Sequence, residues 1–371
     1  MDDLKMANIP LMDVGRLVNK LSDSYSILIE KGLSITGMPS VMLWGPPGVG
    51  KSQAVRQIAQ KIEGRTGKTV KVTDVRLLLF NPIDLRGIPT ANADKTLAVW
   101  LKPQIFQMDS SDEVINVLFL DEISAAPQSV QAAAYQITLD RTVGEHKLPD
   151  NCIVIAAGNR VTDKSVAFKM PKALANRLLH IDIQGSFSAW KEWAIKTEIN
   201  EKVIGFLSFR ENYLMGFNPA FDDLAFATPR SWEMVSNLLN QINDNVDEMY
   251  DLISGVVGAG VAIEFRTWSK IYNSLPDIND IFDGKMPGIP KNPDALYALV
   301  SAMTAHARDN RDNMNKIANS IAYAAHMPPD FSAILMQDYM YLEENYKIKL
   351  MGIPEFSRWM SSRGSLMNAT C

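Results

Sequence analysis

The stretch Gly45-Pro46-Pro47-Gly48-Val49-Gly50-Lys51-Ser52 is the strongest indication of the fold, because it fits the pattern G-x-x-x-x-G-K-[ST] at every fixed position. The apolar run Val41–Trp44 precedes it, and a segment with helical character follows it. Glycines let successive backbone N–H groups turn toward one phosphate, and the start of the helix adds a partial positive charge. The stretch therefore predicts a phosphate-binding loop between a strand and a helix.

The loop also predicts individual roles in binding a nucleoside triphosphate. Lys51 would reach the β- and γ-phosphates, and Ser52 would offer its hydroxyl to Mg²⁺. The alternative is a glycine-rich turn with a chance lysine, and the strand before and the helix after the loop argue against it. The predicted nucleotide-binding residues are Gly45, Pro46, Pro47, Gly48, Val49, Gly50, Lys51, Ser52 and Gln53.

A second element is a strand that ends in two carboxylates. The apolar run Ile115–Leu120 leads directly into Asp121 and Glu122. Asp121 would hold Mg²⁺ through water, and Glu122 would act as the general base for the attacking water. Alone, such a pair is usually a solvated turn. Downstream of a phosphate-binding loop it indicates a hydrolase that uses this glutamate as its base. Signalling GTPases, in contrast, position water without such a glutamate.

A third element is Asn159, which follows the apolar run Cys152–Ala157. If this run lies beside the strand that ends at Asp121, the Asn159 amide would lie near the γ-phosphate and orient the attacking water. An asparagine after a strand is more often a turn residue. This signal is therefore weak without the first two elements.

Two arginines complete the candidate catalytic set. Arg177 lies between a short predicted helix, Pro171–Ala175, and the strand Leu178–Ile183. Arg230 falls in the first turn of a helix for which Thr228 is the expected N-cap. A cation there opposes the helix dipole, so an anion should lie nearby. A carboxylate would serve, and the phosphates of a nucleotide are the other candidate.

The pattern around these elements predicts a mainly parallel sheet with helices on both faces. Helix-like segments at Ser52–Glu63 and Pro127–Leu139 alternate with the strands, and beyond Gly185 the spacing is helical. The strand candidates are Val41–Trp44, Val70–Val75, Ile115–Leu120, Cys152–Ala157 and Leu178–Ile183. We expect an N-terminal helical segment (1–36), an α/β nucleotide-binding domain (37–185), a helical domain (186–283) and a helical C-terminal extension (284–371).

Composition limits the other function classes. The chain has 371 residues, is 47% hydrophobic and carries a formal charge of −5, so no overall field attracts nucleic acid or anionic lipid. Two cysteines, Cys152 and Cys371, make no disulfide framework, and the N-terminus lacks an apolar signal segment. The longest apolar stretch, Leu252–Phe265, is too short to span a bilayer. These features predict a cytoplasmic protein without a membrane span.

In their order along the chain, these motifs resemble the MoxR-like ATPases, a branch of the AAA+ superfamily. The resemblance covers roughly Gly37 to Leu239. It extends to two candidate hairpins, Ile88–Trp100 and Thr142–Leu148, which are similar to the inserts that project toward the centre of the ring in this branch. The matching segments are Gly45–Ser52 (Walker A), Asp84–Gly87, Leu120–Ile123 (Walker B), Ala157–Asn159 (sensor 1), Leu174–Arg177 (arginine finger) and Thr228–Arg230 (sensor 2).

The resemblance implies a P-loop α/β core followed by an all-helical lid and a helical extension, with ATP and Mg²⁺ as ligands. It implies a ring, usually a hexamer, in which Arg177 completes the site of a neighbouring subunit. It also implies chaperone-like remodelling of a protein substrate, often with a partner that carries a von Willebrand factor A domain. Two departures stand out: Ser124-Ala125 replaces the usual Asn-Arg, and Asn176 replaces an acidic residue.

Two other functions remain open from the residues. One is a nucleotide-controlled scaffold, in which hydrolysis is incidental to assembly. The other is a DNA-acting ATPase, which the negative net charge and the lack of a basic-aromatic patch disfavour. The histidines show no metal-ligand spacing, and His180 is expected to pack or bond within its own strand. They are His146, His180, His306 and His326.

Overall fold

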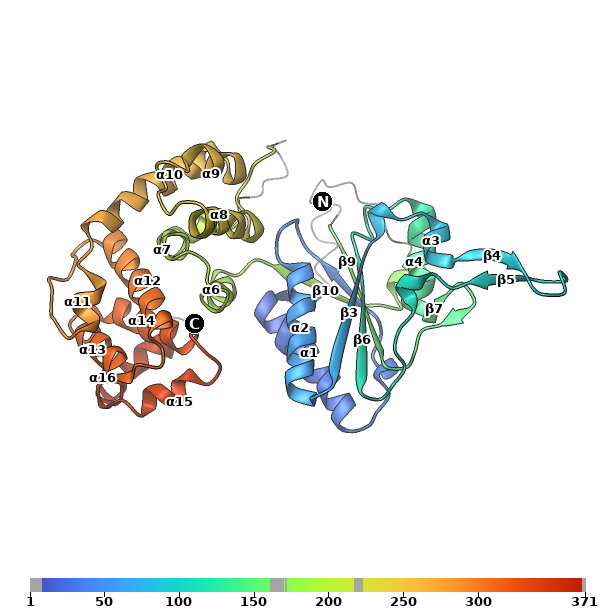
Figure 1. Ribbon diagram of the computed structural model, residues 1–371, viewed down its shortest axis with the longest axis horizontal. Coiled ribbons are helices and arrows are strands. Elements are labelled where there is room, and N and C mark those ends of the chain that lie inside the picture. The colour runs from blue at the N-terminus through green and yellow to red at the C-terminus, as the bar shows by residue number, and fades with distance from the viewer. Residues whose placement is uncertain (1–8, 161–169, 171, 217–222, 369–371) are drawn as a thin grey trace. The chain divides into compact units, whose positions relative to one another are not determined.

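The computed structural model describes residues 9–160, 170, 172–216 and 223–368. The chain divides into two compact units, Met1–Gly185 and Ser186–Cys371 (Figure 1). The first unit contains the sheet, and the second contains most of the helices. Within the described residues, none of the helices has the length and apolar character that a membrane crossing requires.

The first unit is built on a six-stranded sheet in the order β1-β10-β2-β9-β6-β3. Every neighbouring pair in this sheet is parallel, which confirms the predicted α/β class. All five predicted strands are present, and the edge strand β1 was not predicted, because three residues are too few to show a period. The strands are β1 (Leu11–Asp13), β2 (Val41–Trp44), β3 (Thr69–Arg76), β6 (Val114–Asp121), β9 (Cys152–Gly158) and β10 (Leu179–Gln184).

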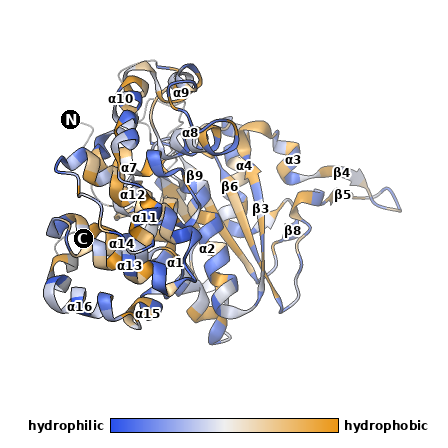
Figure 2. Cartoon of the chain, turned by 60° about the vertical axis from the view of Figure 1, so that its left-hand side comes forward, coloured by the Kyte–Doolittle hydropathy of each residue, from blue (hydrophilic) through white to orange (hydrophobic). Residues whose placement is uncertain are grey.

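The helix α4 shows how a helix packs on the sheet through one apolar face. In α4, the buried residues Val130, Ala133, Ala134 and Ile137 follow the spacing of one helical stripe. They pack in a core with the buried side chains of β6 and β9, and β6 is mostly orange, the colour of hydrophobic residues, in Figure 2. The helices of this unit are α1 (Val14–Glu30), α2 (Lys51–Thr66), α3 (Pro82–Arg86), α4 (Gln128–Asp140) and α5 (Lys172–Ala175).

Two antiparallel hairpins occur where the sequence predicted them. The first joins β4 (Ile88–Ala91) to β5 (Ala98–Leu101), and the second joins β7 (Thr142–Val143) to β8 (His146–Lys147). The β4–β5 ribbon extends away from the sheet of its unit (Figure 1), and each residue of β4 is exposed.

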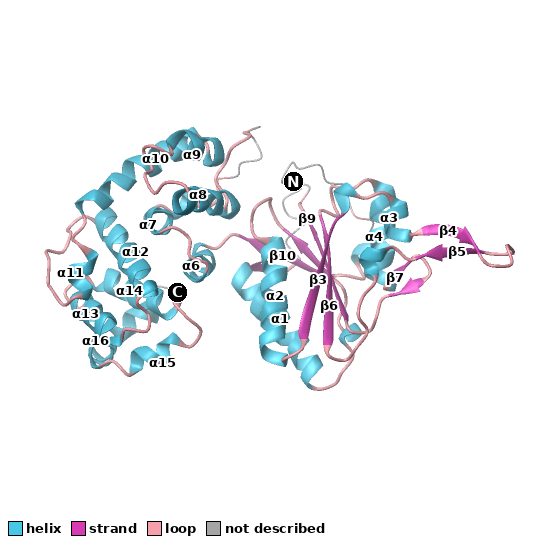
Figure 3. Ribbon diagram, viewed as in Figure 1, coloured by secondary structure: helices cyan, strands magenta, loops and turns pink. Residues whose placement is uncertain are grey.

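In the second unit, the described residues form helices joined by loops (Figure 3). The helical stretch expected at Glu248–Ile263 divides at Gly258, which has φ +88°, and the expected linker Leu275–Asn292 contains α11. The helices are α6 (Phe187–Lys196), α7 (Glu201–Phe209), α8 (Pro229–Gln241), α9 (Tyr250–Val257), α10 (Ala259–Ser269), α11 (Ile278–Phe282), α12 (Pro293–Asp309), α13 (Met314–Ala324), α14 (Pro329–Met340), α15 (Tyr346–Met351) and α16 (Pro354–Arg363).

The helices of the second unit share one core. Its buried apolar side chains form a continuous cluster from Trp190 to Trp359, which crosses the expected boundary between residues 283 and 284. The division of this unit into a lid and an extension therefore stays a prediction.

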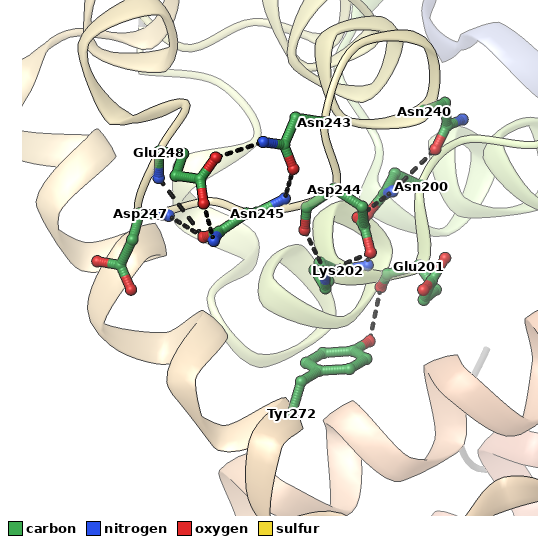
Figure 4. Close-up of polar contacts among 10 residues, drawn as sticks. All are labelled: Asn200, Glu201, Lys202, Asn240, Asn243, Asp244, Asn245, Asp247, Glu248 and Tyr272. Atoms are coloured by element: carbon green, nitrogen blue, oxygen red, sulfur yellow. Dashed lines mark hydrogen bonds and ion pairs between the residues drawn. The ribbon is translucent and has the colours of Figure 1, made fainter.

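Polar contacts tie helices of the second unit together at two places. In α6, Lys191 Nζ lies 2.7 Å from Asp338 Oδ2 of α14, and both side chains are buried. At the start of α7, the Asn200 amide donates to Asn240 Oδ1 at 2.8 Å and to Asp244 Oδ1 at 3.1 Å (Figure 4). The second contact set holds the loop after α8 against α7.

Candidate functional site

The predicted site residues follow three neighbouring strands. In the sheet, β2 lies beside β9 and β9 lies beside β6, all parallel. Gly45, Asp121 and Asn159 therefore stand at the carboxyl ends of adjacent strands, at one edge of the sheet. This edge is where open α/β sheets bind their ligands.

The loop after β2 has the backbone that its glycines predict. Gly48 has φ +76° and Gly50 has φ +104°, in the left-handed region that favours glycine. Gly50 is the N-cap of α2, and its carbonyl accepts from the Ala54 N–H at 2.8 Å. The other predicted loop residues, Pro46, Pro47, Val49 and Gln53, lie in this loop and the first turn of α2.

Lys51, the first residue of α2, connects the loop to β9. The residue is only 9% exposed. Its Nζ donates to Gly45 O at 2.7 Å, to Pro46 O at 3.0 Å and to Asn159 Oδ1 at 2.8 Å. The predicted proximity of Asn159 to the phosphate-binding loop is thus present in the structure.

Ser52 and Asp121 form the second link between these segments. Ser52 Oγ donates to Asp121 Oδ2 at 2.8 Å, across 69 positions in the sequence. Hydroxyl and carboxylate oxygens are the hard ligands that Mg²⁺ prefers. The chemistry of the two side chains therefore fits a magnesium site, with the Ser52 hydroxyl as a ligand and Asp121 acting through water. Among the described residues, no cluster of three or more His, Cys, Asp or Glu side chains forms a metal site of another kind.

Glu122 is held in an unusual backbone conformation. It has φ +59°, which is uncommon for a residue other than glycine, and it is half-buried. Its N–H donates to Asp121 Oδ1 at 2.9 Å, and the next N–H, of Ile123, donates to Ala157 O at 2.9 Å. Such strain persists only where the surroundings enforce it, and it is concentrated at functional sites.

Ser124, noted in the sequence only as a departure from the family pattern, joins the ends of β6 and β9. Its Oγ accepts from the Asn159 N–H at 2.9 Å. A Cβ on Gly158 would lie 2.8 Å from the same oxygen, so a larger residue there would collide with it. Beside it, Arg160 Nε donates to Asp182 Oδ1 at 2.7 Å and anchors the segment after β9 to β10. The sequence showed no signal for these two contacts.

The two arginines take part in none of the contacts described above. Arg177 is exposed in the turn between α5 and β10, and the structure gives it no ion pair among the residues it describes. Arg230 is exposed in the first turn of α8, in the second unit, where Thr228 is the N-cap as predicted. Pro171, the expected first residue of the helix before Arg177, lies outside the described residues.

Comparison with known families gives one match. Residues 40–180 match the model of the ATPase family associated with various cellular activities (AAA). The match runs from the start of β2 into β10 and contains the phosphate-binding loop, Asp121, Glu122 and Asn159. None of the curated proteins matches the chain.

Several solved structures are similar to the chain at low identity. A RuvB mutant from Thermotoga maritima is 15% identical with a TM-score of 0.36, covering 80% of this chain and 85% of that one. PCH-2 from C. elegans is 13% identical with a TM-score of 0.35, covering 68% and 66%. A putative ATPase from Cytophaga hutchinsonii is 16% identical with a TM-score of 0.32, covering 94% and 91%.

The family match and the geometry at the sheet edge define the class of the first unit. It has the α/β fold of an AAA+ P-loop domain, and the match over residues 40–180 supports an ATP-binding ATPase domain.

Proposed function

We propose that this chain is a subunit of an oligomeric, MoxR-like AAA+ ATPase that hydrolyses ATP to remodel or activate a protein partner. One observation carries the proposal: Lys51 bonds to Asn159 while Ser52 bonds to Asp121. Two segments that are distant in the sequence, those of Asp121 and Asn159, thereby meet beside one phosphate-binding loop. A loop that only bound a nucleotide would not need the acidic pair and the asparagine.

The residues of the loop bind the triphosphate. Backbone N–H groups from Gly48 to Gln53 donate to phosphate oxygens, and the start of α2 adds its partial positive charge. Lys51 donates to the β- and γ-phosphates from the buried position that its contacts with Gly45 and Pro46 define. Ser52, and Asp121 through water, would hold Mg²⁺, which would offset the negative charge of the phosphate oxygens.

Glu122 and Asn159 act on the attacking water. Glu122 takes a proton from this water as the general base. The Asn159 amide orients the water beside the terminal phosphate. The contacts of Ile123 and Ser124 with β9 support these roles, because they fix the segment after Glu122 to the segment that carries Asn159.

Arg177 acts in a neighbouring subunit, and Arg230 acts as the sensor of the second unit. The exposure of Arg177, without an ion pair among the described residues, supports a role toward an anion outside its own subunit. The role of Arg230 rests on the order of the motifs and on its place in the first turn of α8. The resemblance adds a hexameric ring and a partner with a von Willebrand factor A domain, and the composition favours a cytoplasmic location.

The shared site is tested by mixing two inactive variants of the full chain. Glu122→Gln should keep ATP binding and lose turnover by about 10²- to 10⁴-fold, the usual contribution of a general base. Arg177→Ala should bind ATP and lose turnover as well. In mixtures, a subunit with Glu122 can receive Arg177 from its neighbour, so part of the activity should return.

Absence of recovery at every mixing ratio, with both variants assembled, would contradict a shared site. If turnover of the unaltered chain also stays slow with partner present, and a non-hydrolysable analogue suffices for assembly, the chain is instead a nucleotide-controlled scaffold.

A further inference from the structure

A chain of side-chain contacts connects the strand before the phosphate-binding loop to the turn that carries Arg177. Trp44 is the last residue of β2 and directly precedes Gly45. Its Nε1–H donates to Nδ1 of His180, in the neighbouring strand β10, at 2.9 Å. The two rings are nearly parallel, with 15° between their planes. His180 Nε2 lies 2.7 Å from the carbonyl oxygen of Ala175. His180 was expected to pack or bond within its own strand; it packs against Trp44 of β2, and both of its ring contacts reach residues outside β10.

These partners fix the hydrogen on the imidazole. An indole N–H can only donate, so Nδ1 of His180 is the acceptor in the contact with Trp44. The carbonyl of Ala175 can only accept, so Nε2 carries the hydrogen. One neutral tautomer satisfies both contacts, and turning the ring over would break them. His180 therefore has a single defined orientation.

The carbonyl that His180 contacts closes the turn around Arg177. Ala175 O also accepts from the Leu178 N–H at 3.3 Å, so Ala175–Leu178 forms a four-residue turn with Arg177 at its third position. Leu178 is buried in the core of the first unit, whereas Arg177 is exposed. The base of the turn is thus fixed to the sheet, and its tip presents the arginine.

We propose that His180 is a positioning residue that holds the turn of Arg177 in the orientation in which the arginine enters the site of a neighbouring subunit. This inference rests on the proposed function of Arg177. An arginine has a long side chain with many rotamers, so ordering it costs entropy and its aim depends on a fixed backbone. A shift of about 1 Å at a catalytic group can lower turnover about a hundredfold. Nothing in the sequence indicates that His180 positions the turn of Arg177.

Two amide substitutions separate the contacts of His180. In His180→Gln, the terminal amide nitrogen can occupy the place of Nε2 and donate to Ala175 O. In His180→Asn, the shorter amide reaches the place of Nδ1, near Trp44, but not Ala175 O. We expect His180→Asn to lower turnover about ten- to a hundredfold. Its affinity for a fluorescent ATP analogue should stay unchanged, and His180→Gln should keep turnover within about threefold of the unaltered chain.

Mixing experiments decide which side of the site His180 serves. A His180→Asn subunit keeps its own Glu122, so mixing it with Glu122→Gln, which supplies an intact Arg177, should restore activity. Mixing it with Arg177→Ala should restore none, because neither subunit then supplies a well-placed arginine. His326 offers a control, because it is exposed and its ring contacts the carbonyl oxygen of Ala322, four residues earlier in the chain. His326→Asn should leave turnover unchanged.

The reverse pattern would overturn the inference. If His180→Asn recovers with Arg177→Ala but not with Glu122→Gln, the histidine acts on the phosphate-binding loop through Trp44. Equal turnover of His180→Asn and the unaltered chain would also refute the inference. If the asparagine variant does not assemble, His180→Phe provides the same readouts, because it loses both hydrogen bonds but fills the space. Failure of the Glu122→Gln and Arg177→Ala mixture, in contrast, would refute the shared site itself.

Discussion

Each unit of the molecule contains a buried lysine, and the two lysines differ in what they contact. Lys51, in the first unit, is 9% exposed and donates to Gly45 O, Pro46 O and Asn159 Oδ1. Lys191, in the second unit, is 7% exposed and pairs with the carboxylate of Asp338. One lysine connects a phosphate-binding loop to the end of a strand, and the other joins two helices.

This difference separates a functional buried charge from a structural one. The contacts of Lys51 lie at the carboxyl edge of a parallel sheet, where a ligand can approach. The helical core encloses Lys191 and Asp338, so the charged form of each side chain is stabilised by the opposite charge of the other. Burial of a charge without its partner is costly. Loss of Lys51 should therefore impair function, and loss of Lys191 should impair stability.

The largest effect is expected at Lys51. In Lys51→Met the chain keeps a side chain of similar length but loses the ammonium that would contact the β- and γ-phosphates. Turnover should fall by at least about 10²- to 10³-fold, the usual loss for one electrostatic donor, and ATP affinity should fall too. Steady-state hydrolysis and titration with a fluorescent ATP analogue measure both. Unchanged ATP affinity in this variant would contradict the assigned site.

Lys191→Met should destabilise the second unit by about 3–5 kcal/mol, because Asp338 stays buried without its partner. Burial already raises the pKa of Asp338, and Lys191 holds it lower than burial alone would. In the variant the pKa should rise further. A raised folded-state pKa gives stability at low pH that is lost as pH rises through it. The deficit, measured by urea unfolding, should be smaller at pH 5 than at pH 8; a deficit independent of pH would contradict this account.

Removing both partners should cost much less than removing Lys191 alone. In Lys191→Met with Asp338→Leu, two apolar side chains replace the pair, and such exchanges are often neutral or stabilising. The free energy of unfolding should return to within about 1–2 kcal/mol of the unaltered chain. If the double variant is as unstable as Lys191→Met, the loss comes from packing rather than from an unpaired carboxylate.

The smallest effect is expected at Lys196, which lies on the same helix as Lys191. It pairs with Glu192 at 2.6 Å, and both side chains are 45% exposed. Solvent screens an exposed pair with this spacing, so Lys196→Ala should change stability by no more than about 0.5 kcal/mol. This variant is the matched control for Lys191→Met in the same unfolding experiments. A loss comparable with that of Lys191→Met would show that burial does not govern the difference.

The fold class of the first unit and most of its strands could be predicted from the sequence alone. Local chemistry explains why: glycine permits the left-handed backbone found at Gly48 and Gly50, and short apolar runs such as Ile115–Leu120, alternating with helical segments, favour buried strands. The acidic pair could be assigned because it directly follows such a run. The sequence predicted that the second unit is helical, but not the bounds of its helices. One expected helix divides at Gly258, and α11 lies in a segment that was expected to be a linker.

Which residues of different elements contact one another could be read only from the tertiary structure. Trp44 and His180 are separated by 136 positions and Ser124 and Asn159 by 35, and neither pair follows a local period. Lys191 and Asp338 likewise look like two surface residues in the sequence, and become a buried pair only when α6 packs against α14. Periodicity reports the neighbours of a residue along one element. Contacts between elements depend on strand order and helix packing, which the whole chain sets.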